Sequence, residues 1–92
     1  MASPRGLFLA LGLMDIQHGH EHYWTTRVED RKGGSVGYQL LRERFGQTVA
    51  VAQTTFWDAA GSFHFNTFNS EDVPVEIVEA AIREAREQIK VR

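Results

Sequence analysis

The chain has 92 residues, of which 42% are hydrophobic and 24% charged, with a formal net charge of −2 and no cysteine. These values are typical of one folded domain with a modest core, and they exclude a disulfide framework, thiolate metal sites and cysteine-based catalysis. The slightly acidic balance lacks the basic field expected of a nucleic-acid-binding protein. We therefore expect a single domain over residues 1–92, and the absence of cysteine is compatible with a cytoplasmic protein.

The first part of the chain contains one continuous apolar run, Gly6 to Met14. The run is too short to span a bilayer, which needs about 20 apolar residues, so we expect no membrane segment. We interpret residues 1–19 as an N-terminal extension or an extra edge strand, and residues 20–92 as the folded core.

Next along the chain, residues His20 to Glu29 are rich in aromatic and β-branched side chains, which favours a strand. Asp30 to Gly34 interrupts it with charges and glycines. Ser35 then has the chemistry of a helix N-cap, and Gly46 has that of a C-cap. The sequence thus predicts a helix over Val36 to Phe45, with apolar residues spaced three and four apart on one face.

Two strands are predicted to follow, Thr48 to Trp57 and Ser62 to Phe68. The link Asp58-Ala59-Ala60-Gly61 suits a hairpin turn with a bulge, in which Asp58 faces Ser62. This register places Trp57, Phe63 and Phe65 on the buried side. The opposite side would carry a partner surface of Phe56, His64 and Phe68.

The final element is an amphipathic helix that starts near Pro74, a residue favoured in the first helical turn. Its apolar residues are spaced three and four apart, as expected for a helix that covers a sheet. The predicted buried stripe consists of Val75, Val78, Ile82, Ala85 and Ile89.

The resulting order is strand, helix, strand, strand, helix. It predicts an α+β two-layer sandwich with the βαββα plan of a ferredoxin-like fold that lacks its last strand, sheet order 1-3-2 and both helices on one face. The missing strand leaves a free sheet edge. Either residues 7–13 fold back to fill this edge, or two copies pair edge to edge. We expect self-association to a homodimer, because a core this small gains stability from extra burial.

His18, His20 and His22 form the sharpest local cluster of chemically active residues. Alternate residues of an extended chain point the same way, so three imidazoles could converge on Zn, Ni or Cu. This would be the only cofactor. The competing interpretation is a polar, solvated lead-in to the first core strand.

Lys32, Gly33, Gly34 and Ser35 precede the predicted helix. A helix N-terminus with free N–H groups and a nearby lysine is an anion-binding site. The segment Gly33 to Gly37 also matches the G-x-S-x-G pattern of a nucleophile elbow. However, the chain is too short for the sheet that such hydrolases need, and we expect no enzyme activity.

The aromatic spacing of Phe63, Phe65 and Phe68 resembles the third strand of the RNA-recognition motif. That resemblance implies a single-stranded nucleic-acid-binding sheet. Gly61 and Ser62 stand where the family has a basic residue and a glycine, and the register above buries two of the three rings. Core packing explains the same pattern.

Taken together, these features predict a small non-enzymatic binding or assembly module that forms a homodimer. A histidine-cluster metal-binding protein and a single-stranded nucleic-acid-binding domain are the alternatives. The absence of a basic field makes a nucleic-acid partner the less favoured one.

Overall fold

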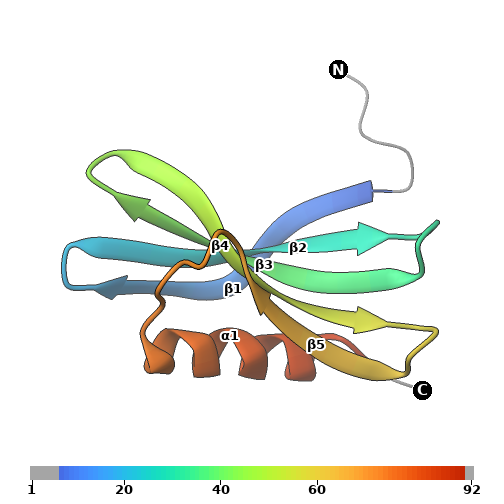
Figure 1. Cartoon of the computed structure of the whole chain (residues 1–92). Coiled ribbons are helices and arrows are strands. Elements are labelled where there is room, and N and C mark those ends of the chain that lie inside the picture. The colour runs from blue at the N-terminus through green and yellow to red at the C-terminus, as the bar shows by residue number, and fades with distance from the viewer. Residues whose placement is uncertain (1–6, 91–92) are drawn as a thin grey trace.

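In the computed structural model, which describes residues 7–90, the chain forms a five-stranded antiparallel sheet followed by one helix (Figure 1). Successive strands are neighbours, so the sheet order is β1-β2-β3-β4-β5. The elements are β1 (Leu7–His18), β2 (Glu21–Asp30), β3 (Ser35–Arg44), β4 (Gln47–Trp57), β5 (Ser62–Thr67) and α1 (Val75–Gln88).

The predicted ferredoxin-like βαββα sandwich is wrong. The strands expected near residues 20–29, 48–57 and 62–68 are confirmed, as is the helix that begins near Pro74. Residues 36–45, however, do not form a helix, because Ser35–Arg44 is strand β3. Without that crossover helix all neighbouring strands are antiparallel, and the order 1-3-2 is replaced by a meander.

The segment of β3 is extended because its buried residues alternate. Tyr38, Leu40 and Arg42 are buried, with Gln39 and Leu41 half-buried between them. This is the period of two that a strand requires. The inward position of Arg42 hides this alternation in the sequence, because charged residues are rarely buried.

The N-terminal apolar segment is an edge strand, in agreement with one of the two roles predicted for it. β1 pairs with β2 in antiparallel register, from Leu7 opposite Asp30 to His18 opposite Glu21. Residues 1–6 of the predicted extension lie outside the described part of the chain.

The register of the β4–β5 hairpin differs by one residue from the predicted register. Trp57 pairs with Ser62, and Phe56 pairs with Phe63. The loop is closed by a hydrogen bond from the Gly61 N–H to the Trp57 carbonyl at 2.8 Å. A shift of one residue turns every side chain of a strand to the other face. Phe56 is therefore buried, and Trp57 is 42% exposed.

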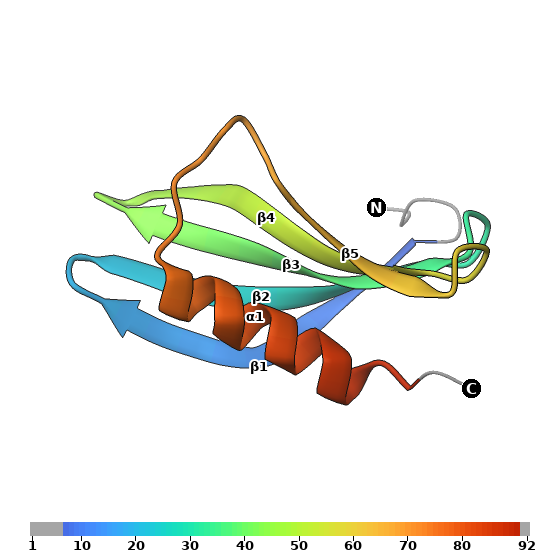
Figure 2. The same ribbon diagram turned by 60° about the horizontal axis from the view of Figure 1, so that its bottom comes forward.

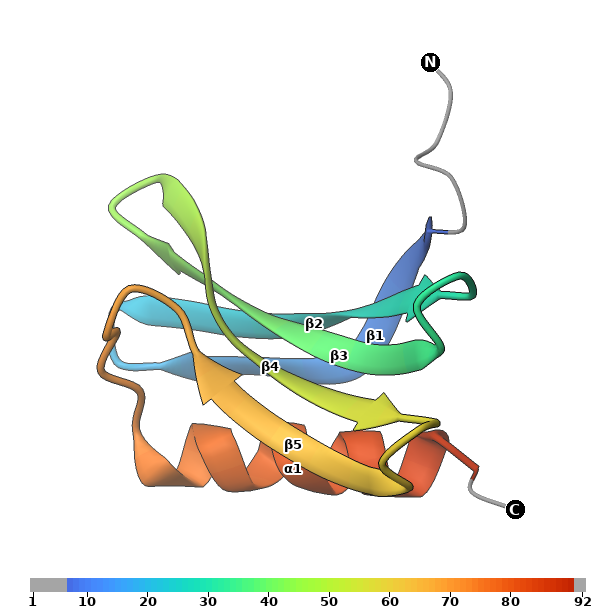
Figure 3. The ribbon, with the colours of Figure 1, turned by 45° about the vertical axis from the view of Figure 1, so that its right-hand side comes forward.

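One face of the sheet is covered by α1, which packs against β1, β3 and β4 (Figures 2 and 3). The buried stripe of the helix is Ile77, Ala81 and Ala85, continued by Ile89 just after its end, whereas Val75 is exposed. The predicted stripe was therefore partly wrong. Two clusters fill the space between the layers: Met14, Tyr23, Leu40, Val51, Ala52, Ile77 and Ala81, and beside them Tyr38, Phe56, Ala85 and Ile89.

The opposite face of the sheet carries no helix or strand of the described chain (Figure 3). We call it the open face. Paired residues of neighbouring strands point to the same side of a sheet, and successive residues of one strand point to opposite sides, so the register defines the residues of this face. They include Leu11, Asp15, His22, Trp24, Thr26, Val28, Asp30, Ser35, Gln39, Leu41, Glu43, Gln53, Thr55, Trp57 and His64.

Candidate functional site

A buried carboxylate joins the helix to the edge strand. The Glu84 side chain of α1 accepts hydrogen bonds from the backbone N–H groups of Leu13 and Met14, at 2.5 and 3.3 Å, and from Thr25 Oγ1 at 2.6 Å. The sheet register is interrupted here, so that residues 12–14 of β1 lie opposite Thr25 alone. Glu84 thus binds the N–H groups that the β-bulge leaves without strand partners.

The bulge requires glycine at position 12. A Cβ added to Gly12 would lie 2.2 Å from Thr25 Oγ1 and 2.8 Å from a Glu84 carboxylate oxygen. The bulge twists the edge strand, and Glu84 binds the N–H groups of Leu13 and Met14. For both reasons, β1 cannot offer a continuous backbone edge to another strand.

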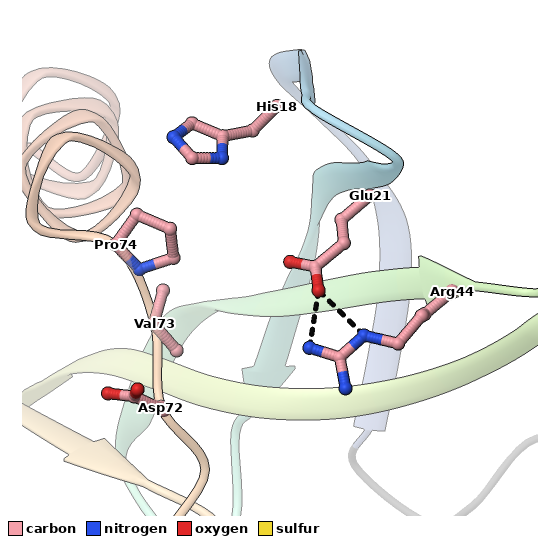
Figure 4. A pocket seen from close by; sticks show the side chains of 6 residues that line it. All are labelled: His18, Glu21, Arg44, Asp72, Val73 and Pro74. Atoms are coloured by element: carbon pink, nitrogen blue, oxygen red, sulfur yellow. Dashed lines mark hydrogen bonds and ion pairs between the residues drawn. The ribbon is translucent and has the colours of Figure 1, made fainter.

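An open cleft of about 420 Å³ lies at one end of the molecule. The turn between β1 and β2, the end of β3 and the segment before α1 form its walls (Figure 4). In Figure 4 the His18 imidazole points toward Pro74, while Arg44 is bonded to Glu21. The lining residues are His18, Glu21, Arg44, Asp72, Val73 and Pro74.

Most of the charge in this cleft is already neutralised within the protein. Glu21 accepts a hydrogen bond from the Tyr23 hydroxyl at 2.7 Å and one from Arg44 Nε at 2.6 Å. The bond from Tyr23 and the charge of Arg44 lower the pKa of Glu21 below its ordinary value, against the opposing effect of burial. Burial and the neighbouring carboxylate raise the pKa of Tyr23 to about 12. These hydrogen bonds hold the side chains of Glu21, Tyr23 and Arg44 in fixed positions.

A second ion pair ties β3 to the segment before the helix. Arg42 Nη2 lies 2.9 Å from Glu71 Oε1, and the arginine side chain is 7% exposed. Its Nε–H has no hydrogen-bond partner among the described residues. Because this donor is unpaired, Arg42 stabilises the fold less than a buried arginine with all its donors hydrogen-bonded would.

The three histidines of the predicted metal site do not share a face. His18 pairs with Glu21 and lies on the helix side of the sheet. His22 pairs with Gln17 and lies on the open face, where it contacts Asp15 at 2.6 Å. His20 is in the turn between β1 and β2. In residues 7–90 no three histidine, aspartate or glutamate side chains are close enough to hold a metal ion.

The helix N-terminus on which the predicted anion site depends is not present in the structure, because Ser35–Arg44 is a strand. Lys32, Gly33 and Gly34 belong to the turn between β2 and β3, and Ser35 begins β3 instead of capping a helix. The turn is closed by a hydrogen bond from the Gly33 N–H to an Asp30 carboxylate oxygen at 2.9 Å. An anion would meet that carboxylate, and no helix N-terminus lies at this turn.

The predicted partner surface is also divided by the structure. Phe56 is buried in the core next to Phe63, with ring centroids 5.1 Å apart. His64 lies on the open face and bonds Ser62 at 2.9 Å. Phe68 follows the end of β5 and donates its N–H to Val51. Phe63 and Phe65, two of the three rings of the resemblance, lie on the helix side of the sheet and not on the open face.

The open face carries apolar side chains among polar ones. Trp24 and Leu41 are paired neighbours close to the end that carries His22 and Glu43, and Val28 lies further along β2. Leu11 on the β1 edge is 80% exposed, and Trp57 at the end of β4 is 42% exposed. Between them lie uncharged polar side chains: Thr26, Gln39, Gln53 and Thr55. Charged residues occur only toward the ends and the β1 edge: Asp15, Asp30 and Glu43.

Comparison of the chain with protein-family models, with curated proteins and with solved structures finds no match. The helix in residues 7–90 lacks the length and apolar character needed to cross a bilayer.

Sequence reasoning missed Glu84, Arg42 and Tyr23, the residues that organise these surfaces. A charged residue such as Glu84 is expected on the exposed side of an amphipathic helix. Its position, three residues after Ala81 and seven after Ile77, puts it on the buried stripe. The spacing was legible, but a carboxylate is rarely buried without a partner, and the partners lie in a bulge that no local pattern indicates.

Proposed function

We propose that the protein is a non-enzymatic binding module that associates with a second copy of itself through the open face. The observation that carries the proposal is that no described helix or strand covers one side of the five-stranded sheet, which carries the paired apolar residues Trp24 and Leu41. Apolar side chains on an uncovered sheet face of a small domain mark an interaction site. We propose a cytoplasmic location, with which the absence of cysteine from the chain is compatible.

Neither edge of the sheet supports self-association as favourably as the open face does. The bulge at residues 12–14 interrupts β1, and Glu84 occupies its N–H groups. β5, the other edge, has only six residues. Bulged and short edge strands are devices that prevent strand addition. The predicted edge-to-edge pairing is therefore less favourable than face-to-face packing.

The charge of the open face does not suit a polyanion. The arginines of the strands, Arg27, Arg42 and Arg44, lie on the helix side. The ionised groups of the open face are Asp15, Asp30 and Glu43. A nucleic acid would meet carboxylates and no lysine or arginine along these strands, which argues against the single-stranded nucleic-acid-binding alternative.

The test is the dissociation constant of the dimer, measured by dilution with light scattering or sedimentation. Leu41→Lys places an ammonium group within the apolar part of the face, and we expect it to weaken association at least about tenfold, because burying an unpaired charge is costly. Phe45→Lys is the matched control, since Phe45 is 89% exposed in the β3–β4 turn and lies outside the face. Equal dissociation constants for the two variants would overturn the proposal, provided circular dichroism shows both folded.

A further inference from the structure

The position of the charges selects one arrangement of the two copies, given that the proposed self-association through the open face is correct. Packed sheets keep their strand directions within about 30° of each other. A two-fold axis in the interface can then run along the strands or across them. The middle strand, β3, faces its own copy in both cases, because the sheet order is β1-β2-β3-β4-β5.

An axis along the strands brings like charges together. Glu43 of β3 would face Glu43 of the second copy, at the end of the open face. No lysine or arginine of the strands lies on this face to offset the two carboxylates. Like charges held together at an interface are strongly unfavourable, so this arrangement is disfavoured.

An axis across the strands brings opposite charges together. It reverses β3 on itself, so that Glu43 of one copy lies over Ser35 of the other, next to Asp30 and the turn with Arg31 and Lys32. The two basic residues of this turn outnumber the single carboxylate of Asp30, which is already bonded to the Gly33 N–H. Both basic residues are exposed, and neither takes part in an ion pair among the described residues. His22 lies over Asp30 of the second copy by the same symmetry.

Gln39, the residue that would lie at the two-fold axis, can also face Gln39 of the second copy favourably. Gln39 is in the middle of β3, between Thr26 and Gln53. An amide has both donors and an acceptor, so two glutamines related by a two-fold axis can satisfy each other. Two carboxylates or two ammonium groups at that point could not.

The area is sufficient for a stable pair. Ten residues of strand extend about 33 Å, and five strands cover about 24 Å, so the open face offers about 800 Å² from each copy. Stable protein interfaces bury about 800 Å² per partner.

We infer that two copies pack open face to open face with antiparallel strands, Gln39 at the two-fold axis and Glu43 of each copy beside the Arg31–Lys32 turn of the other. The absence of cysteine allows a clean cross-linking test, because every introduced thiol is unique. Facing sheets are about 10 Å apart, beyond the reach of a disulfide, so a short bismaleimide is the suitable reagent.

Gln39→Cys is expected to cross-link to itself, Glu43→Cys to remain uncross-linked alone, and an equimolar mixture of Glu43→Cys and Ser35→Cys to form the heterodimeric product. Phe45→Cys, outside the face, is the control for random collision. Self-cross-linking of Glu43→Cys at the level of Gln39→Cys would overturn the antiparallel arrangement while leaving self-association intact. A dimer in which Gln39→Cys does not cross-link would overturn it too, and a monomeric wild-type protein would remove the proposed function itself.

A charge exchange gives an independent measurement. Glu43→Lys and Lys32→Glu should each weaken the dimer several-fold, and the double variant should recover most of the loss. The recovery should shrink in high salt, because the charges lie at the rim. Additive losses in the double variant would contradict the arrangement.

Discussion

The Thr25 hydroxyl of β2 donates a hydrogen bond to the Glu84 carboxylate of α1 at 2.6 Å, across the gap that the β1 bulge opens. This bond connects three elements, because the same carboxylate accepts the N–H groups of Leu13 and Met14 from β1. It holds the helix on one face of the sheet and interrupts the edge strand. The open face is consequently the sheet surface that remains for a partner.

We expect Glu84→Ala to lower the free energy of unfolding by at least about 2 kcal/mol, because each buried donor left unpaired costs about 1–3 kcal/mol. Urea unfolding followed by circular dichroism measures this loss. Glu87→Ala is the matched control, since Glu87 is exposed one turn further along α1. A loss as small as that of the control would show that the carboxylate does not hold the bulge.

Gly12→Ala should destabilise the protein by about 1–3 kcal/mol, the usual cost of overpacking. The new Cβ would meet Thr25 Oγ1 at 2.2 Å. Removing that hydroxyl relieves the clash, so in a Thr25→Ala background the same glycine substitution should cost less. Strictly additive free energies in this double-mutant cycle would rule out the predicted contact.

Acid should weaken the fold through Glu21. The bond from Tyr23 and the charge of Arg44 hold the pKa of Glu21 below its ordinary value of 4.5. A depressed pKa in the folded state adds stability above the unfolded value, and this stability is lost as the pH falls through the folded pKa. Glu21→Gln should therefore lose less stability than the wild type between pH 5 and pH 3, as chemical unfolding at each pH would reveal. Parallel curves for the two proteins would be the contrary result.

The Tyr23 hydroxyl should titrate abnormally. Its burial and its bond to Glu21 raise its pKa from 10.0 to about 12. The neutral form is favoured in the folded state, so the associated stability is present below pH 10 and lost as the pH rises toward 12. Absorbance of tyrosinate in the wild type, minus that of Tyr23→Phe, isolates this group from the second tyrosine. A difference transition near 10 in protein that is still folded would contradict the structure.

The sequence predicted the elements with strong local patterns and failed where packing decides. The last hairpin and the helix after Pro74 carry turn and amphipathic signals that their own residues determine. β3 was misread because Arg42 faces inward, held by Glu71 from a distant segment. No local pattern shows that ion pair, and without it the spacing of Tyr38, Leu41 and Phe45 is that of a helix.

The register error had a similar cause. A turn with Asp58 first and Gly61 last fits a loop of either three or four residues. The structure has Trp57 opposite Ser62, which buries Phe56 in place of Trp57. Packing against α1 settles this choice, since Phe56 contacts the cluster that includes Ala85 and Ile89. Of the residues predicted on the uncovered face, His64 is there, whereas Phe56 is in the core and Trp57 is on the face that was expected to lack it.

Sedimentation equilibrium of the wild-type protein over a dilution series tests the central claim most directly, because it reports association without any substitution. Association through the open face predicts a mass near twice the 10.4 kDa of one chain at high concentration, falling toward one chain on dilution. A mass of 10.4 kDa at every concentration, for folded protein, would contradict it.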